Sequence, residues 1–350
     1  MKNKAVHFEV LRIIAIFFVV FQHTGEYGAQ LYYNLEPTSI SYWLSMFTYM
    51  FGKIAVPIFF MISGALLLKK DEPLSVILKK RVLRIFLVLL IVSVGYYLIE
   101  NMDNLSFALI PDFFKLFFTK GIQKNLWYLY SYIAALLMLP FLRILVKKLK
   151  DEHYKYLIVI NILLTSVASV CSAFWLKKDI HPDLEIPFAT FWNIFYMLMG
   201  YYLEYVIPKK NYTNKNAVKF LFLGIAVTGL CVLISHFYFS KNGYTDKNLI
   251  FSKKFMTLPA LALYFFVKTL CQNKVPSERL SKFILFLGSN VFGIYLADSL
   301  LRRVFISLLD ILPPVIGDLP ACYLYVFICV VAGFIVIGLL RLIPFVRKLI

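Results

Sequence analysis

The most constraining feature of this chain is a series of apolar segments, each about 20 residues long, separated by short charged or polar stretches. A helix needs about 20 apolar residues to cross roughly 30 Å of hydrocarbon. Hydrophobic residues make up 61% of the 350 residues and charged residues 16%, whereas a soluble domain is about half apolar and about a quarter charged. The pattern excludes a soluble globular protein, a disordered chain and a disulfide-rich secreted module. It also argues against the alternating segments of about 10 residues that build a β-barrel.

We therefore expect an all-α integral membrane protein, a bundle of about ten transmembrane helices. No long polar insertion interrupts the apolar segments, so residues 1–350 are predicted to form a single membrane domain. The first segment carries Arg12 and His23 and lacks a small-residue cleavage site, which favours a retained helix over a signal peptide. The segments are predicted near 6–24, 42–68, 82–99, 126–146, 156–176, 188–207, 217–239, 255–270, 283–309 and 319–343.

The charge pattern predicts the orientation of these helices. The chain has 37 Lys and Arg against 19 Asp and Glu, a net charge of +18. A basic chain can bind nucleic acid, but in a membrane protein the positive residues gather on cytoplasmic loops. With the N-terminus inside, every inner loop is positive. We therefore expect both termini in the cytoplasm, an even number of spans and no nucleic-acid partner. The five cysteines have no metal-like spacing and are predicted to be small buried hydrophobes.

Arg12 and His23 are the first candidate site residues, because ionisable groups within spans usually face the bundle interior or a water-filled cavity. They are eleven residues apart, which places them on one helix face, about 16 Å apart along the axis. One interpretation is a pair of interfacial side chains, with Arg12 snorkelling to the membrane surface. The other is a catalytic pair, with His23 as a general base near the outer end. Glu26, three residues further on, is then a candidate to orient the imidazole.

Arg81 and Arg84 begin the third predicted span, in the segment KRVLRI. Residues three apart face the same side of an α-helix, and two guanidinium groups on one face suit a phosphate or pyrophosphate. The alternative is that both residues only mark the cytoplasmic side.

Other polar residues stand where a span should be apolar. Lys53 lies within the second span, near its outer end, and needs a carboxylate, a carbonyl or an anionic substrate. Pro57 is expected to kink that span, and Ser63-Gly64 permits close helix approach. Asp298 is an isolated carboxylate that can pair with Lys53 or His23, or bind an acceptor hydroxyl. We expect a substrate cavity lined by Lys53, Ser63, Asn125, Trp127, Tyr128 and Asp298.

Six segments, in chain order, then point to a family. They are LRIIAIFFVVFQH, FFMISGALLL, KRVLRI, NLWYL, FYMLMGYYL and FGIYLADSLL, and together they extend over nearly the whole chain. With them the chain resembles the membrane-bound acyltransferase-3 family, the bacterial surface-polysaccharide O-acyltransferases. Two positions depart from the family pattern: Asn125 and Asp298 stand where members often have His.

The resemblance implies a multi-pass protein of the bacterial cytoplasmic membrane. It implies transfer of an acyl group, usually acetyl, from cytoplasmic acyl-coenzyme A to a hydroxyl of an extracytoplasmic or lipid-linked glycan, without a metal. Arg81, Arg84 and Arg12 would bind the phosphates and stem of acetyl-coenzyme A. His23 would act as general base or as transient acyl carrier, and Lys53, Ser63 or Trp127 would help hold the thioester or its oxyanion.

Two other functions remain open at this point. The first is a transporter or flippase of a lipid-linked sugar or an anionic solute, although the internal repeats typical of transporters are not evident. The second is a polysaccharide polymerase or glycosyltransferase, although the outer loops near 100–125 and 240–254 are short for that role. The enzyme hypothesis requires a cavity that joins His23 to the arginines of the third span.

Overall fold

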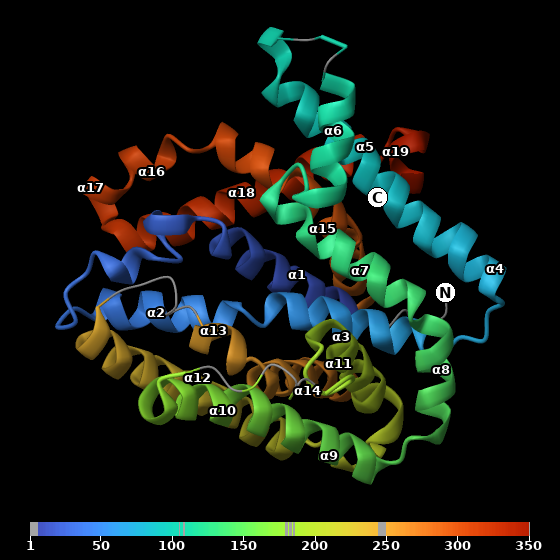
Figure 1. Cartoon of the computed structure of the whole chain (residues 1–350), viewed down its shortest axis with the longest axis vertical. Helices are drawn as coiled ribbons and strands as arrows, with labels where there is room; N and C mark the ends of the chain where they lie inside the picture. Colours follow the sequence, from blue (N-terminus) through green and yellow to red (C-terminus); the bar gives the residue numbers. More distant parts are fainter. Residues whose placement is uncertain are drawn as a thin grey trace.

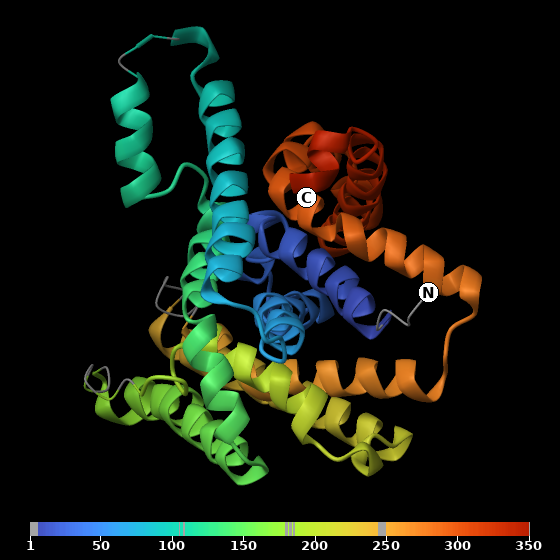
Figure 2. The same cartoon turned by 90° about the vertical axis from the view of Figure 1, so that its right-hand side faces the viewer.

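The structure, a computed structural model, describes residues 6–349 except 105, 108, 179–180, 182–183, 185 and 244–249. All regular secondary structure in these residues is helical. The long helices run side by side across the view of Figure 1, and the hairpin of α5 and α6 projects from the rest (Figure 2). The first helix, α1 (Val6–Gln22), begins at the right-hand side of Figure 1, and the last helix, α19 (Pro344–Leu349), lies on the same side. Residues 1–5 and 350, on which the prediction for the termini also rests, lie outside the described residues.

The longer helices account for most of the described chain. They are α1, α2 (Ile40–Gly52), α3 (Ala55–Leu67), α5 (Leu83–Glu100), α6 (Leu109–Thr119), α7 (Trp127–Leu137), α8 (Leu139–Lys148), α9 (Asp151–Ile162), α11 (Trp192–Tyr201), α12 (Asn214–Asn242), α14 (Thr257–Asn273), α15 (Glu278–Val304) and α18 (Asp318–Leu340). The short helices are α4 (Leu74–Val76), α10 (Ala168–Cys171), α13 (Ile250–Lys254), α16 (Leu308–Ile311), α17 (Pro313–Ile316) and α19. Helical turns of the π type occupy Ile77–Val82, Leu163–Val167, Ser172–Leu176 and Tyr202–Val206.

Among the described residues, six helices are long and apolar enough to cross a membrane. They are Ile40–Leu67, Leu74–Glu100, Asp151–Leu176, Asn214–Asn242, Glu278–Val304 and Asp318–Leu340. The pair Lys124–Leu137 and Leu139–Lys148, bent by 60°, makes a seventh if it is one span.

The other three predicted segments are helical but short. α1 and α14 each have 17 residues, and α11 has 10 before its π-helical extension. The protein is therefore a multi-pass helical membrane protein with six or seven clear spans, and the count of ten stays a prediction.

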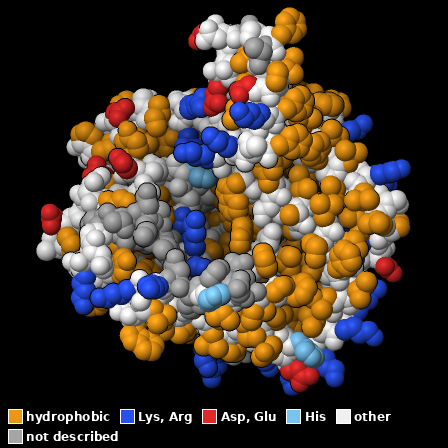
Figure 3. Space-filling view, in the orientation of Figure 1, with side chains coloured by type: hydrophobic (Ala, Val, Ile, Leu, Met, Phe, Trp, Pro, Cys, Tyr) orange, Lys and Arg blue, Asp and Glu red, His pale blue; other side chains and the backbone are white. Residues whose placement is uncertain are grey.

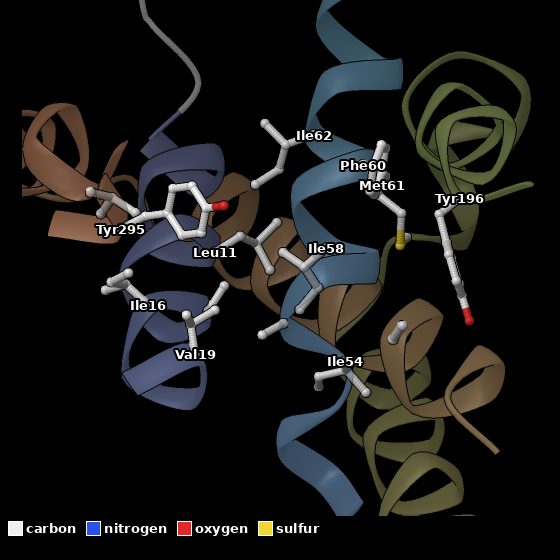
Figure 4. Close-up of a cluster of buried hydrophobic side chains, with 14 of the residues drawn as sticks. Leu11, Ile16, Val19, Ile54, Ile58, Phe60, Met61, Ile62, Tyr196 and Tyr295 are labelled. Atoms are coloured by element: carbon white, nitrogen blue, oxygen red, sulfur yellow. The ribbon is translucent and has the colours of Figure 1, made fainter. Parts of the chain in front are cut away.

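α1 is the central helix of the bundle. It contacts α2, α3, α14, α15 and α18, and its buried side chains recur every three or four residues, as an amphipathic helix requires. Figure 4 shows Leu11 of α1 and Ile58 of α3 directed toward each other, with Tyr295 of α15 beside them. Because α1 is packed on several sides, its side chains face other helices or the space between them rather than lipid.

α3 and α11 cross in close contact at two glycines. A Cβ added to Gly64 would collide with the carbonyl oxygen of Met197, and one added to Gly200 would collide with that of Met61. This reciprocal contact confirms the expectation that Ser63-Gly64 permits close approach, and it brings α11 to the side of α3 opposite α1 (Figure 4).

The second span is interrupted in its middle. α2 ends at Gly52, Lys53 and Ile54 form a turn, and α3 starts at Ala55. Pro57 falls in the first turn of α3, where its missing N–H would have had no partner. The expected irregularity near Pro57 is thus confirmed. Lys53, however, lies at a mid-span break rather than near the outer end of a continuous helix.

Candidate active site

A cavity of about 1090 Å³ lies between the helices around α1. Its wall combines α1, the α2–α3 break and the beginnings of α5 and α7 with α13 and α15. Figure 3 shows a hollow with basic side chains on the face seen in Figure 1, a side of the bundle rather than an end of its long helices. The wall includes eight of the residues expected at the site: Arg12, His23, Lys53, Ser63, Arg84, Asn125, Trp127 and Tyr128.

His23, at the end of α1, is held by a carboxylate from α15. Its Nδ1 lies 2.7 Å from Oδ2 of Asp298, whose side chain is fully buried while that of His23 keeps 26% exposure. Arg302, one turn further along α15, donates from Nε to both Asp298 oxygens at 3.2 Å and from Nη1 to the His23 carbonyl at 2.9 Å. Because Asp298 accepts at Nδ1, the favoured neutral tautomer of His23 presents an unprotonated Nε2.

Arg12 and Arg84 lie on the wall of the same cavity as His23. Arg12 pairs with Glu9, one turn before it on α1, and α15 approaches this turn closely because Gly288 has no Cβ to meet Glu9. Arg84 opens α5 and donates to the carbonyl of Leu349 at 3.2 Å. The helical spacing that placed Arg12 and His23 on one face is confirmed, since both face one cavity.

Asn125 is buried on the cavity wall with an unused side chain. It is 7% exposed, and neither its amide nitrogen nor its amide oxygen has a hydrogen-bond partner among the described residues. Its backbone carbonyl is occupied, because it accepts from the Tyr295 hydroxyl at 2.6 Å. Buried side-chain amides are rarely left unsatisfied, so the Asn125 amide is available to a bound molecule.

Aromatic rings form another part of the wall. The ring centres of Trp127 and Trp192 are 5.2 Å apart, and Tyr128 stacks on Tyr132 with ring centres 5.7 Å apart. Ser63 donates to the Phe59 carbonyl at 2.8 Å. These rings supply a flat, apolar surface against which an extended ligand can pack.

A family model described as an acyltransferase domain matches residues 6–340 of the chain. The chain belongs to the acyltransferase-3 family. The protein is accordingly an acyltransferase by family, and the match includes every described site residue. No curated protein and no solved structure gives a match.

Arg81 was expected to bind coenzyme A together with Arg84, but it does not border the cavity. Arg81 makes a two-pronged ion pair with Glu72, and Arg143 of α8 binds the same carboxylate at 2.9 Å. The two arginines, with Arg81 the larger influence, lower the pKa of Glu72 to about 2, so the pair stays charged at neutral pH. The reason lies in the backbone: Arg81 sits in the π-helical turn Ile77–Val82, where α-helical spacing does not apply.

Two other residues lie elsewhere than expected. Glu26 is exposed in the short 3₁₀ helix Gly25–Tyr27 after α1, and the contact with the imidazole that was expected of it is made by Asp298. Asp298 does not border the cavity, although it was expected to. Its side chain is fully buried and contacts the Nδ1 side of His23.

Sequence reasoning missed Arg302, Lys253 and Lys254 as parts of the site. Arg302 follows Asp298 by four residues, the spacing of an intrahelical ion pair, so its role was detectable. The lysines of α13 lie in the segment 240–254, which was expected to be a short outer loop. They reach the cavity because the Lys254 carbonyl accepts from Ser166 at 2.7 Å and from Thr165 at 3.3 Å, contacts that tie α13 to the segment after α9.

Proposed function

We propose that this acyltransferase moves an acyl group, normally acetyl, from cytoplasmic acyl-coenzyme A to a hydroxyl of an extracytoplasmic or lipid-linked glycan, in the bacterial cytoplasmic membrane. One observation carries the proposal: a single cavity joins Arg84 to His23, whose Nδ1 is held by a buried carboxylate. A transporter would need no such orientation of an imidazole, whereas a general base does.

The donor would enter at the end of the cavity marked by Arg84. Guanidinium groups bind phosphate oxygens well, so Arg84, aided by Arg12, is assigned to the phosphates of coenzyme A. The pantetheine arm would then extend along α1, past the aromatic wall of Trp127 and Tyr128. The rise of about 16 Å between Arg12 and His23 is comparable to the length of a pantetheine arm, which would place the thioester beside the imidazole.

His23 would act as general base. Its Nε2 takes the proton of the acceptor hydroxyl as the oxygen attacks the thioester carbonyl carbon. Asp298 stabilises the imidazolium that forms, and Arg302 holds the Asp298 carboxylate in place. The C–S bond then breaks, and the imidazolium returns its proton to the departing thiolate sulfur.

The carbonyl oxygen becomes negatively charged during this step and needs a donor. Asn125 is assigned to it, because the residue borders the cavity and its buried amide nitrogen has no partner among the described residues. Losing one such donor costs about 10²–10³-fold in kcat. This role would also explain why an amide is compatible with the position where members of the family often have His.

The experiment measures coenzyme A release from acetyl-coenzyme A by the full chain in lipid nanodiscs, with and without a glycan acceptor. His23→Ala should abolish acceptor-dependent release while the protein keeps its thermal unfolding temperature. His236→Ala is the matched control, because His236 binds the Tyr42 hydroxyl at 2.8 Å and does not border this cavity. Normal turnover in His23→Ala would reject the assignment.

A second measurement separates general base from acyl carrier. The protein is mixed with radiolabelled acetyl-coenzyme A and no acceptor and is denatured rapidly in detergent at neutral pH, because acid would hydrolyse an acyl-imidazole. The chain should stay unlabelled if His23 is a base. Label that is present in the unaltered chain and lost in His23→Ala would show a covalent acyl-imidazole instead.

A further inference from the structure

The cavity wall has a one-sided charge. Among the described residues that border it, none is Asp or Glu, while five are Lys or Arg. The donor accounts for two of these, Arg12 and Arg84. The other three, Lys53, Lys253 and Lys254, have no role in the mechanism above.

These three lysines gather at the His23 end of the cavity. Gln22, next to His23, donates to the Tyr49 carbonyl at 2.7 Å, one turn before Lys53. The Lys53 ammonium lies 4.2 Å from the centre of the Tyr49 ring, and Lys253 is close enough to Lys53 for their charges to repel. The cluster therefore flanks the acceptor side of the imidazole, opposite the end marked by Arg84.

No carboxylate of the described residues pairs with these lysines. The ion pairs among the described residues include none of the three. Two hydroxyl contacts to the Lys254 carbonyl hold α13 against the cavity, and the α2–α3 break directs Lys53 into it. Lys53 and Lys254 are half-buried and Lys253 is exposed. Like charges that line one cavity repel one another unless an anion joins them.

We infer that the acceptor is anionic: it carries a carboxylate or a phosphate close to the hydroxyl that is acylated, and Lys53 and Lys253, with Lys254 beside them, bind that group. The inference rests on the proposed function and narrows it to one class of acceptor. A sugar carboxylate and the diphosphate of a lipid-linked sugar have the same chemistry here. Either would place its negative charge on the lysines and its hydroxyl at Nε2 of His23.

The test uses the full chain in nanodiscs, saturated with coenzyme A, and measures equilibrium binding of three probes. These are a glucuronate-containing disaccharide, its carboxyl-reduced neutral counterpart, and glucose linked to a polyprenyl diphosphate. At least one charged probe should bind about 10-fold or more tightly than the neutral disaccharide, and added salt should reduce the preference. The two charged probes separate sugar carboxylate from lipid phosphate.

Lys53→Gln and Lys253→Gln should each weaken the charge preference, and the double variant should remove it. Lys115→Gln on α6 is the control, because Lys115 is exposed and does not border the cavity. Equal binding of charged and neutral probes, undetectable binding of all three, or a preference that survives in the double variant would overturn the inference.

Acetyl-coenzyme A consumption with the same probes separates the two proposals. His23-dependent acylation of the neutral disaccharide at an equal rate would retain the proposed function and reject the anionic acceptor. Lysine-dependent binding of the charged probes without any acyl transfer would reject the proposed function and retain the anionic ligand.

Discussion

His23 and Asp298 are 275 positions apart in the chain, and the packing of α15 against α1 brings them together. Asp298 is fully buried, and both of its oxygens are used by Arg302, so its orientation is well determined. The His23 ring is thereby fixed at one nitrogen and open to the cavity at the other. This is the division of roles that lets an imidazole move a proton in either direction.

Asp298→Asn tests that division. An amide can donate to Nδ1, which would favour the tautomer with its proton on Nε2 and remove the base. We expect kcat to fall by about 10²-fold or more, with little change in KM for acetyl-coenzyme A. Steady-state kinetics on the variant give both values. Tyr325→Phe is the control, since it removes the 2.9 Å bond to the Arg302 carbonyl and leaves His23 and Asp298 unchanged. An equal loss of kcat in both variants would indicate a general disturbance of α15.

Arg84 and Arg81 make a second comparison at this scale. Arg84→Ala should raise KM for acetyl-coenzyme A about 10-fold with a smaller effect on kcat, because a charge-assisted hydrogen bond contributes about 1.5–3 kcal/mol. Arg81→Ala should leave KM unchanged and lower the unfolding temperature instead, because Glu72 loses a partner. The kinetics and a thermal unfolding curve for each variant check this pair, and a KM effect confined to Arg81→Ala would contradict it.

At the scale of elements, the regular helices were predictable, whereas the π-helical turns were not, and the break near Pro57 was the irregular segment that the sequence indicated. The Arg12–His23 spacing worked because α1 is an unbroken α-helix. The α-helical spacing does not describe Arg81 and Arg84, because a π-helical turn ends between them, and no residue in KRVLRI indicates that turn. The pairing of His23 with Asp298 was one of several options in the sequence, and choosing among them needs the relative placement of α1 and α15. Only contacts across the bundle supply that placement.

The close crossing of α3 and α11 leaves no room for a methyl group at its glycines, so a substitution there should lower stability. Gly200→Ala should push the two helices apart, since the new Cβ would overlap the Met61 carbonyl, and overpacking of this kind costs about 1–3 kcal/mol or more. Activity should fall too, because Trp192 and Tyr196 of α11 border the cavity. Thermal unfolding in detergent measures the loss. Gly95→Ala on α5, where nothing lies within 4 Å of the added Cβ, should cause none.

At the scale of the whole molecule, the two ends of the cavity differ in chemistry: one carries Arg84, and the other carries an imidazole and lysines. In the proposed function, Arg84 marks the end that accepts the donor, and His23 with the neighbouring lysines marks the other. Such a site needs the donor on one side of the membrane and the acceptor on the other, or within the bilayer. The orientation of the chain therefore decides whether the enzyme can use cytoplasmic acetyl-coenzyme A.

The distribution of Lys and Arg predicts both termini in the cytoplasm, and α1 and α19 meet one end of the bundle. Green fluorescent protein should therefore fluoresce when fused to either terminus, while alkaline phosphatase at those positions should be inactive. A phosphatase fusion after Lys241, near the end of α12, should be active, because that end is predicted to lie outside. Seven spans would put the termini on opposite sides and make one terminal phosphatase fusion active. The fusions thus decide between an even and an odd number of spans.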